Sequence, residues 1–173
     1  MFISMKNLYL IRHAKSSWDD PNLDDFDRPL NERGEKDAPR MGRRLKEKKI
    51  TPDIVVSSPA IRALETCKII CDVLGFEKKK IIEHQSVYHA SEEEILKVVR
   101  SLKDRRGDNE ENVLLFGHNP GLTDFANRLL NEHIVNIPTA GIVAAQLKID
   151  KWSKTDWGCG KLLFFDFPKN KRE

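Results

Sequence analysis

Apolar stretches of strand length alternate along this chain with longer segments whose apolar residues recur at helical spacing. The short runs predict strands at residues 7–11, 53–57, 80–83, 112–116, 141–149 and 161–167. The periodic segments predict helices at residues 31–48, 60–74, 91–102 and 119–129. Alternation of this kind is typical of an α/β fold with a mostly parallel sheet, covered by helices on both faces. Little helix separates the last two strands, so we expect a hairpin-like edge there.

The second expected helix has recognisable signals at both ends. Ser58 is expected to be its N-cap, with Pro59 in the first helical position, and Gly75 is a natural stop. Asn119 and Pro120 repeat the cap-then-proline pattern before the last expected helix. The local sequence therefore predicts two helices that begin directly after two of the strands.

Charge and composition narrow the class of protein. The 30 basic residues barely outnumber the 27 acidic ones, which leaves a net charge of +3, whereas a dedicated nucleic-acid binder concentrates positive charge. No stretch approaches the roughly 20 consecutive apolar residues of a membrane span, and the start of the chain lacks the features of a secretory signal. Three cysteines argue against a disulfide framework, and Cys67 and Cys71 lie on an apolar helix stripe suited to core packing. We expect one cytoplasmic domain spanning residues 1–173, monomeric and without nucleic-acid or membrane partners.

Polar residues follow three of the expected strands, at the point where each strand ends. Arg12 and His13 follow the first strand, Arg62 lies shortly after the second, and His118 and Asn119 follow the fourth. Because the carboxyl ends of parallel strands meet at one edge of a sheet, we expect these side chains to converge. Arginine forks suit a phosphoryl group, helix N-termini favour an anion, and a neutral histidine can attack phosphorus. Each motif alone is more often structural, but the three together predict a phosphoryl-transfer site.

Three short motifs carry a resemblance to a known family. They are Arg12-His13-Ala14, Arg62 within residues 57–66 (SSPAIRALET), and residues 117–120 (GHNP). On these motifs the chain resembles the histidine phosphatase superfamily, also called the phosphoglycerate mutase-like superfamily. Within it, the SixA-type phosphohistidine phosphatase branch is similar at residues 12–18 (RHAKSSW), 27–34 (DRPLNERG) and 138–141 (PTAG). The resemblance covers nearly the whole chain.

The resemblance implies a three-layer α/β fold and a metal-independent phosphatase without cofactors. It implies that His13 takes the phosphoryl group as a covalent intermediate, which water then hydrolyses. Arg12, Arg62 and His118 would hold the three equatorial oxygens, and Asn119 would be a further phosphate contact. Phosphoryl transfer needs mainly positioning and electrostatic stabilisation, which such a set supplies.

The chain departs from the family pattern at two places that bear on the substrate. Asp19 stands where mutase-like members often have an asparagine near the phosphate, and an acidic group there would repel the substrate, so we assign it no binding role. Mutase-like members also use a glutamate to protonate the alcohol leaving group, and no residue of 86–92 matches it clearly. Glu92 and Glu94 fit a capping box that begins at Ser91. Imidazole leaves more readily than an alkoxide, so the missing acid favours phosphohistidine over an ester.

Three hypotheses follow for the function. The leading one is a phosphatase that removes a phosphoryl group from phosphohistidine, with a phosphotransfer protein as its partner. The alternative enzyme is a phosphatase of small phosphoesters or phosphoanhydrides. The third, from another class, is a catalytically idle module that binds phosphoproteins. The presence of both His13 and His118 argues against it, because a pure binder needs no nucleophile.

Two features have more than one interpretation. The aspartate-rich segment 19–27, next to Trp18, is either a solvated loop or a rim that recognises a protein partner. His84 and His133 are expected to be structural, whereas for His89 both a structural role and a place in the site are open.

Overall fold

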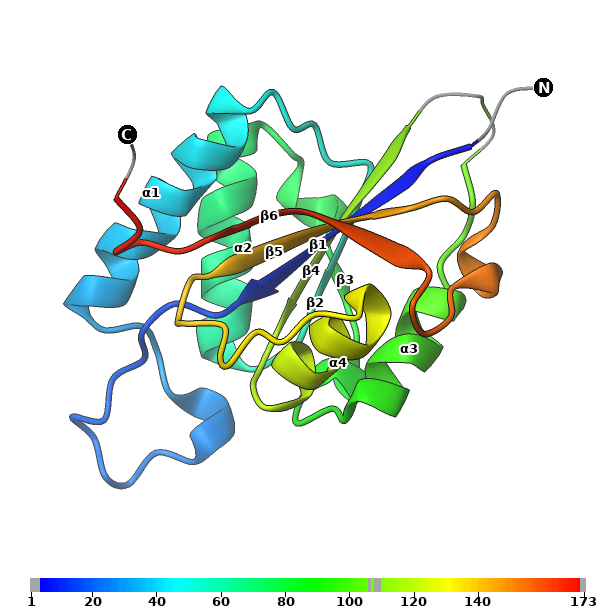
Figure 1. Ribbon diagram of the computed structural model, residues 1–173. Coiled ribbons are helices and arrows are strands. Elements are labelled where there is room, and N and C mark those ends of the chain that lie inside the picture. Colours follow the sequence, from blue (N-terminus) through cyan, green and yellow to red (C-terminus); the bar gives the residue numbers. More distant parts are fainter. Residues whose placement is uncertain (1–3, 106, 108–109, 172–173) are drawn as a thin grey trace.

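The computed structural model describes residues 4–105, 107 and 110–171. Within these residues, a six-stranded sheet with the order β3-β2-β4-β1-β5-β6 lies at the centre (Figure 1). Its strands are β1 (Lys6–Arg12), β2 (Ile54–Ser57), β3 (Ile82–Glu83), β4 (Glu111–Gly117), β5 (Ile142–Leu147) and β6 (Gly160–Asp166). The β3, β2, β4 and β1 strands are parallel, while β5 and β6 form an antiparallel edge. This confirms the mostly parallel sheet, although β3 is shorter than expected because Lys78–Lys80 form a 3₁₀ turn.

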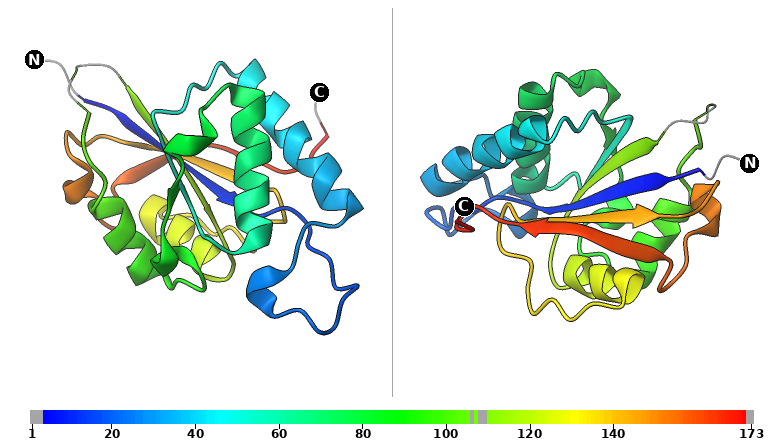
Figure 2. Two further views of the ribbon diagram at one scale, coloured as in Figure 1. Left: turned by 180° about the vertical axis from the view of Figure 1, so that it is seen from behind. Right: turned by 45° about the horizontal axis from the view of Figure 1, so that its top comes forward.

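The helices cover the sheet in two pairs. One pair is α1 (Glu32–Glu47) with α2 (Ile61–Leu74), and the other is α3 (Glu92–Arg100) with α4 (Gly121–Leu130). The pairs lie on opposite faces of the sheet (Figure 2), which confirms the three-layer α/β fold. None of the helices in the described residues is long and apolar enough to cross a bilayer.

The central strand β1 supplies side chains to two separate apolar cores. Leu8 and Leu10 pack in the core beneath α3 and α4, whereas Tyr9 and Ile11 pack in the core beneath α1 and α2. Successive side chains of a strand point to opposite faces, so each face receives every second residue. Burial on both faces explains why this strand is an unbroken apolar run in the sequence. Cys67 and Cys71 belong to the second core, as expected.

Most helix ends follow the local sequence. Asn31 caps α1, because its side chain accepts a hydrogen bond from the Gly34 amide (2.9 Å). The capping box of α3 is complete: the Ser91 hydroxyl accepts from the Glu94 amide (3.3 Å), and the Glu94 carboxylate accepts from the Ser91 amide (2.8 Å). The α2 helix is followed by Gly75 in the left-handed region, with φ of 73°.

Two helix starts differ from expectation, and both lie near the carboxyl edge of the sheet. The N-cap of α2 is Ala60, so Ser58 does not cap this helix. The N-cap of α4 is Pro120, which follows a cis peptide bond, so Asn119 does not cap that helix. Both caps were predicted from local pattern and are wrong. The Ser58 hydroxyl accepts from the Ala60 amide (3.2 Å) and contacts His118, and the Asn119 carboxamide oxygen accepts from the Thr123 hydroxyl (2.8 Å).

Two glycines let backbone segments meet at the same edge. A Cβ atom on Gly34 would lie 2.2 Å from the Lys15 carbonyl oxygen, and one on Gly121 would lie 1.8 Å from the Ala90 carbonyl oxygen. Backbone atoms cannot rotate away as a flexible side chain can. Gly34 therefore allows α1 to pack against the segment after β1, and Gly121 allows α4 to pack against the segment before α3.

Candidate active site

His13 is the first residue beyond β1, and backbone hydrogen bonds hold it on both sides. Its amide donates to the Gly117 carbonyl (3.2 Å), and its carbonyl accepts from the Ala140 amide (3.0 Å). The ring is buried, and its Nδ1 lies 2.8 Å from the Ala14 carbonyl oxygen. A carbonyl oxygen only accepts, so Nδ1 carries the hydrogen in this bond. The lone pair of the neutral ring therefore sits on Nε2.

The surroundings of His13 keep the ring neutral. Burial lowers the pKa of His13 to about 4, and the nearby charges of Arg62, Arg12 and Arg28 add to this effect. The hydrogen bond to the Ala14 carbonyl acts in the opposite direction without outweighing them. A neutral imidazole with a free lone pair is the nucleophilic form of histidine.

His118 leaves β4 beside His13, with the two ring centroids 5.2 Å apart. Its Nε2 lies 2.7 Å from the hydroxyl of Ser58, the residue that was expected to cap α2. Burial lowers the pKa of His118 to about 3, and the charges of His13, Arg62 and His89 act in the same direction. The Asp25 carboxylate opposes this lowering but does not reverse it. Near neutral pH both rings are therefore uncharged.

Two arginines lie beside these rings. Arg12 donates from Nη1 to the Ile137 carbonyl (2.9 Å). Arg62 is buried in the first turn of α2 and donates from Nη1 to the Asp25 carbonyl (2.6 Å) and from Nη2 to the Asp25 carboxylate (2.9 Å). Burial lowers the pKa of Arg12, and the charge of Arg62 lowers it further, because the two guanidinium groups repel each other. An anion between them would relieve that repulsion.

Several nitrogen atoms of this group lack a hydrogen-bond partner. Across the described part of the chain, the buried side-chain atoms without a partner are Arg12 Nε, Arg62 Nε, His84 Nδ1, Glu111 Oε1 and His118 Nδ1. Three of these five atoms belong to the three residues predicted to hold phosphate oxygens. An unpaired buried polar group costs about 1–3 kcal/mol, so such atoms call for a reason.

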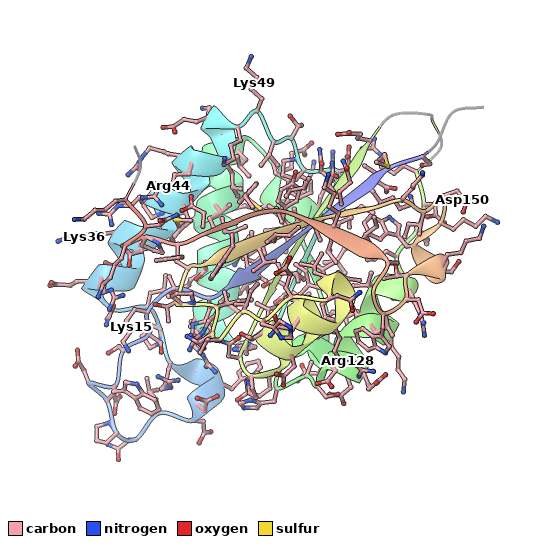
Figure 3. The ribbon with its side chains drawn as sticks, in the orientation of Figure 1. Lys15, Lys36, Arg44, Lys49, Arg128 and Asp150 are labelled. Atoms are coloured by element: carbon pink, nitrogen blue, oxygen red, sulfur yellow. The ribbon has the colours of Figure 1, made fainter. Side chains whose placement is uncertain are left out.

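A hollow of about 330 Å³ brings the predicted residues together at the carboxyl edge of the sheet. It is lined by Arg12, His13, Lys15, Ser16, Trp18, Arg28, Arg62, His89, His118, Asn119 and Thr139. Lys15, labelled in Figure 3, lies on the segment between β1 and α1. The described residues of this lining include four permanent cations and no carboxylate. The α2 and α4 helices also begin at this edge, so their positive N-terminal ends add to the field. The hollow is suited to a small anion.

Asp25 is the one aspartate of segment 19–27 that turns toward the site. Its Oδ2 accepts hydrogen bonds from Arg62 (2.9 Å) and from the Tyr88 hydroxyl (2.7 Å), and its Oδ1 accepts from Arg28 Nη2 (3.0 Å). Partial burial works against ionisation, but the hydrogen bonds from Tyr88, Arg62 and Arg28 together hold the pKa of Asp25 well below its usual range. Asp25 therefore ties its loop to two other segments as a carboxylate.

The remaining aspartates of segment 19–27 are exposed. Trp18 is 71% exposed and covers the guanidinium of Arg28, which lies 3.5 Å from the ring centroid. Neither of the two interpretations of this segment anticipated the inward turn of Asp25. Whether the exposed part recognises a protein partner stays a prediction.

All five residues predicted for the site line the hollow. The Asn119 side-chain nitrogen Nδ2, however, donates to Asn136 Oδ1 (2.8 Å) and to the Ile137 carbonyl (2.9 Å). Its contact with phosphate therefore stays a prediction. Sequence reasoning missed Arg28 and Asp25. Arg28 lies in segment 27–34, whose match to the SixA-type branch could have indicated it, but no local pattern distinguishes Asp25 from its neighbours. His89, whose role was open, lies in the wall of the hollow.

In the described residues, no three His, Cys, Asp or Glu side chains are grouped so that they could hold a metal ion. The side chains of the hollow are instead arginines, a lysine, imidazoles, hydroxyls, one indole and one carboxamide. This set can bind a tetrahedral oxyanion, and it presents one imidazole nitrogen in nucleophilic form.

Comparison with known sequences supports the motif assignment. Residues 8–87 match the histidine phosphatase superfamily (branch 1). An uncharacterised chloroplastic protein of Arabidopsis thaliana is 29% identical over 153 residues, which cover 86% of this chain and 70% of that protein. Phosphoglycerate mutase 1 of Saccharomyces cerevisiae is 40% identical over 67 residues, which cover 38% of this chain and 27% of the mutase. The match to the mutase is thus confined to a part of each protein.

Solved structures match over far more of the chain. A protein from Agrobacterium tumefaciens assigned as the phosphohistidine phosphatase SixA has a TM-score of 0.77 and 26% identity, covering 94% of this chain and 97% of its own. The protein histidine phosphatase SixA in complex with tungstate has a TM-score of 0.77 at 20% identity, which supports the fold. The motifs are thus gathered in one hollow, residues 8–87 match the histidine phosphatase superfamily (branch 1), and the fold is shared with a SixA structure over nearly the whole length.

Proposed function

We propose that this protein is a phosphatase that takes the phosphoryl group from phosphohistidine on a phosphotransfer protein, through a covalent phosphohistidine on His13. One observation carries the proposal. The neutral, buried ring of His13 shares a cationic hollow with unpartnered nitrogen atoms of Arg12, Arg62 and His118. A phosphoryl group bound in this hollow would offset the charges of the two arginines and place phosphorus next to the nucleophile.

The reaction proceeds in two steps. The Nε2 lone pair of His13 attacks phosphorus, and the bond to the substrate nitrogen breaks. Water then attacks the phosphoryl group on His13, which releases inorganic phosphate and restores the neutral ring. The guanidinium groups of Arg12 and Arg62 stabilise the charge that spreads over the equatorial oxygens in both transition states. Removing one such contact should cost about 3 kcal/mol of transition-state stabilisation.

Two arguments favour phosphohistidine as the substrate class. The fold matches two proteins described as SixA with a TM-score of 0.77, against 0.63 for a phosphoglycerate mutase from Plasmodium falciparum that covers a similar share of this chain. In addition, the described lining of the hollow offers no carboxylic acid to protonate an alkoxide. The imidazole of a phosphohistidine can be protonated on its second nitrogen before the N–P bond breaks, so it leaves as a neutral group.

A second candidate function is hydrolysis of small phosphoesters or phosphoanhydrides. The observation that favours it is His89, a residue type that exchanges protons near neutral pH and that lies in the wall of the hollow. The two candidates differ in the bond that is broken and share the intermediate on His13.

The test measures phosphate release from a phosphotransfer domain carrying phosphohistidine and from a panel of phosphoesters. The variants are His13→Ala and, as a matched control, His133→Ala, which removes an exposed histidine outside the hollow. We expect fast release from phosphohistidine that needs His13 and is unaffected by the control. Faster release from esters would instead establish the second candidate. Absence of an acid-labile phosphoryl adduct on His13 with every donor would refute both, and would leave a phosphoprotein-binding module.

A further inference from the structure

His89 stands at the mouth of the hollow, opposite its buried floor. The His13 and His118 side chains are buried, whereas the His89 side chain is 61% exposed. The His89 ring nevertheless faces the same space, with its centroid 6.1 Å from that of His118. In an in-line displacement the leaving atom departs on the side of phosphorus away from the nucleophile. With His13 on the floor, that side is the mouth, where His89 lies.

The ring of His89 is held in place by two contacts. It packs on the Tyr88 ring, with the centroids 4.0 Å apart, and its Nε2 lies 3.4 Å from the Asp25 carboxylate. A carboxylate on one ring nitrogen leaves the other nitrogen to exchange a proton with a substrate, an arrangement used for histidine acid–base catalysis. Asp25 is itself fixed by Arg62 and Arg28, so the orientation of His89 is coupled to two arginines that line the hollow.

The other titratable groups around the hollow are less suited to donate a proton. Burial holds His13 and His118 in the neutral form near pH 7. The Tyr88 hydroxyl already donates to Asp25 (2.7 Å), and burial together with Asp25 raises the pKa of that hydroxyl. Lys15 also lines the hollow and is the one group that must be compared with His89 directly.

We propose that His89 is the proton donor to the leaving atom, a role that extends the substrates of the site from N–P bonds to phosphoesters with basic leaving groups. In the first step, His13 Nε2 forms a bond to phosphorus, the P–O bond breaks, and the protonated His89 ring gives its proton to the departing oxygen. In the second step, water attacks phospho-His13 and passes a proton to the neutral His89 ring. The cycle ends with inorganic phosphate and with both rings in their starting states. This inference rests on the proposed function, because it requires the intermediate on His13.

The experiment compares His89→Gln with wild type over aryl phosphates, from para-nitrophenyl phosphate, with a weakly basic leaving group, to phenyl phosphate, with a strongly basic one. The quantity measured is kcat/KM, which reports formation of phospho-His13 and excludes its hydrolysis. General acid catalysis contributes about 10²–10⁴-fold, so we expect kcat/KM for phenyl phosphate to fall by about 10²-fold. For para-nitrophenyl phosphate and for phosphohistidine we expect losses of less than about threefold, because these leaving groups need no donor.

Matched variants keep the result specific. His133→Gln should leave kcat/KM unchanged for every substrate. Lys15→Gln should lower it by one common factor, because a charge in the lining would attract the phosphoryl group of every substrate equally. An equal loss for all substrates in His89→Gln would overturn the proposal, as would a leaving-group dependence that appears in Lys15→Gln instead. Failure of the proposed function gives a different result, since wild type would then form no phospho-His13 with any donor.

Discussion

His13 and His118 lie side by side because the residues before them, Arg12 and Gly117, are register partners in the parallel strands β1 and β4. The ring centroids are 5.2 Å apart. A parallel pair continues in step, so the next residue of each strand leaves the sheet at the same level. The register of two apolar strands thereby sets the distance between the proposed nucleophile and a proposed phosphate ligand.

The neutral state of His13 can be measured directly. Burial lowers its pKa to about 4, so its ring resonances in an NMR titration should have a midpoint near pH 4, and those of His118 a midpoint near pH 3. His13→Asn and His118→Asn assign the signals. The unfolded chain binds these protons first, so folding stability should fall as pH drops below about 6.5 and continue to fall until the native pKa values are passed. A midpoint near 6.5 for His13 would contradict the burial argument.

Ser58→Ala tests whether the hydroxyl positions His118. The bond from Ser58 to His118 Nε2 is 2.7 Å long, and a hydrogen bond of this kind contributes about 0.5–1.5 kcal/mol. We expect kcat to fall severalfold, because the His118 ring loses its orientation. KM should change little, because the arginines still bind the phosphoryl group. Ser58→Thr should restore most of kcat. Ser101→Ala, which removes an exposed serine at the end of α3, is the control. An unchanged kcat in Ser58→Ala would mean that His118 needs no such support.

Asp25→Asn tests the carboxylate that ties segment 19–27 to α2 and to Tyr88. The native pKa of Asp25 lies below its ordinary value, so its contribution is present above about pH 3.9 and is lost as pH falls through the native pKa. Urea unfolding should therefore show the variant less stable than wild type at pH 7. The difference should shrink as the solution is made more acidic than about pH 3.9. A difference that does not change with pH would show that shape, and not charge, matters at this position.

Gly121→Ala tests the close approach between α4 and the segment before α3. The added Cβ would lie 1.8 Å from the Ala90 carbonyl oxygen, so the backbone must shift. Overpacking of this kind costs about 1–3 kcal/mol, which corresponds to a drop of several degrees in Tm. Gly117→Ala is a milder comparison, because its Cβ would meet the Val87 side chain at 3.3 Å. Equal melting temperatures for wild type and Gly121→Ala would contradict the contact.

That the predicted site residues lie together could be predicted from the sequence, because it depends only on where parallel strands end. Arg12, His13 and His118 follow strands that the apolar runs identify, and parallel strands end at one edge. Arg62 lies in the first turn of α2, the helix that follows β2, so its side chain also starts near this edge. For these residues the local pattern and the tertiary structure agree.

The contacts that sequence missed share a different property. Ser58 was expected to cap a helix, but its hydroxyl meets His118, a residue of another strand end. Asp25 accepts hydrogen bonds from Arg62 and Tyr88, which lie on separate segments. It differs from its neighbouring aspartates only in the direction that the loop takes at its position. Such bonds depend on the path of a loop, and no periodicity or capping rule encodes that path.

The two apolar cores on either side of the sheet have a consequence for how activity arises during folding. Arg62 lies on α2 and Asp25 on the segment that leads into α1, while Tyr88 and His89 lie on the segment that leads into α3. They meet only beyond the strand ends, where Tyr88 donates to Asp25 across the divide. A half-assembled molecule with one layer in place would hold at most part of this cluster. The rate at which turnover returns after dilution from denaturant should therefore report when both helix layers have packed on the sheet, and not when either one has formed.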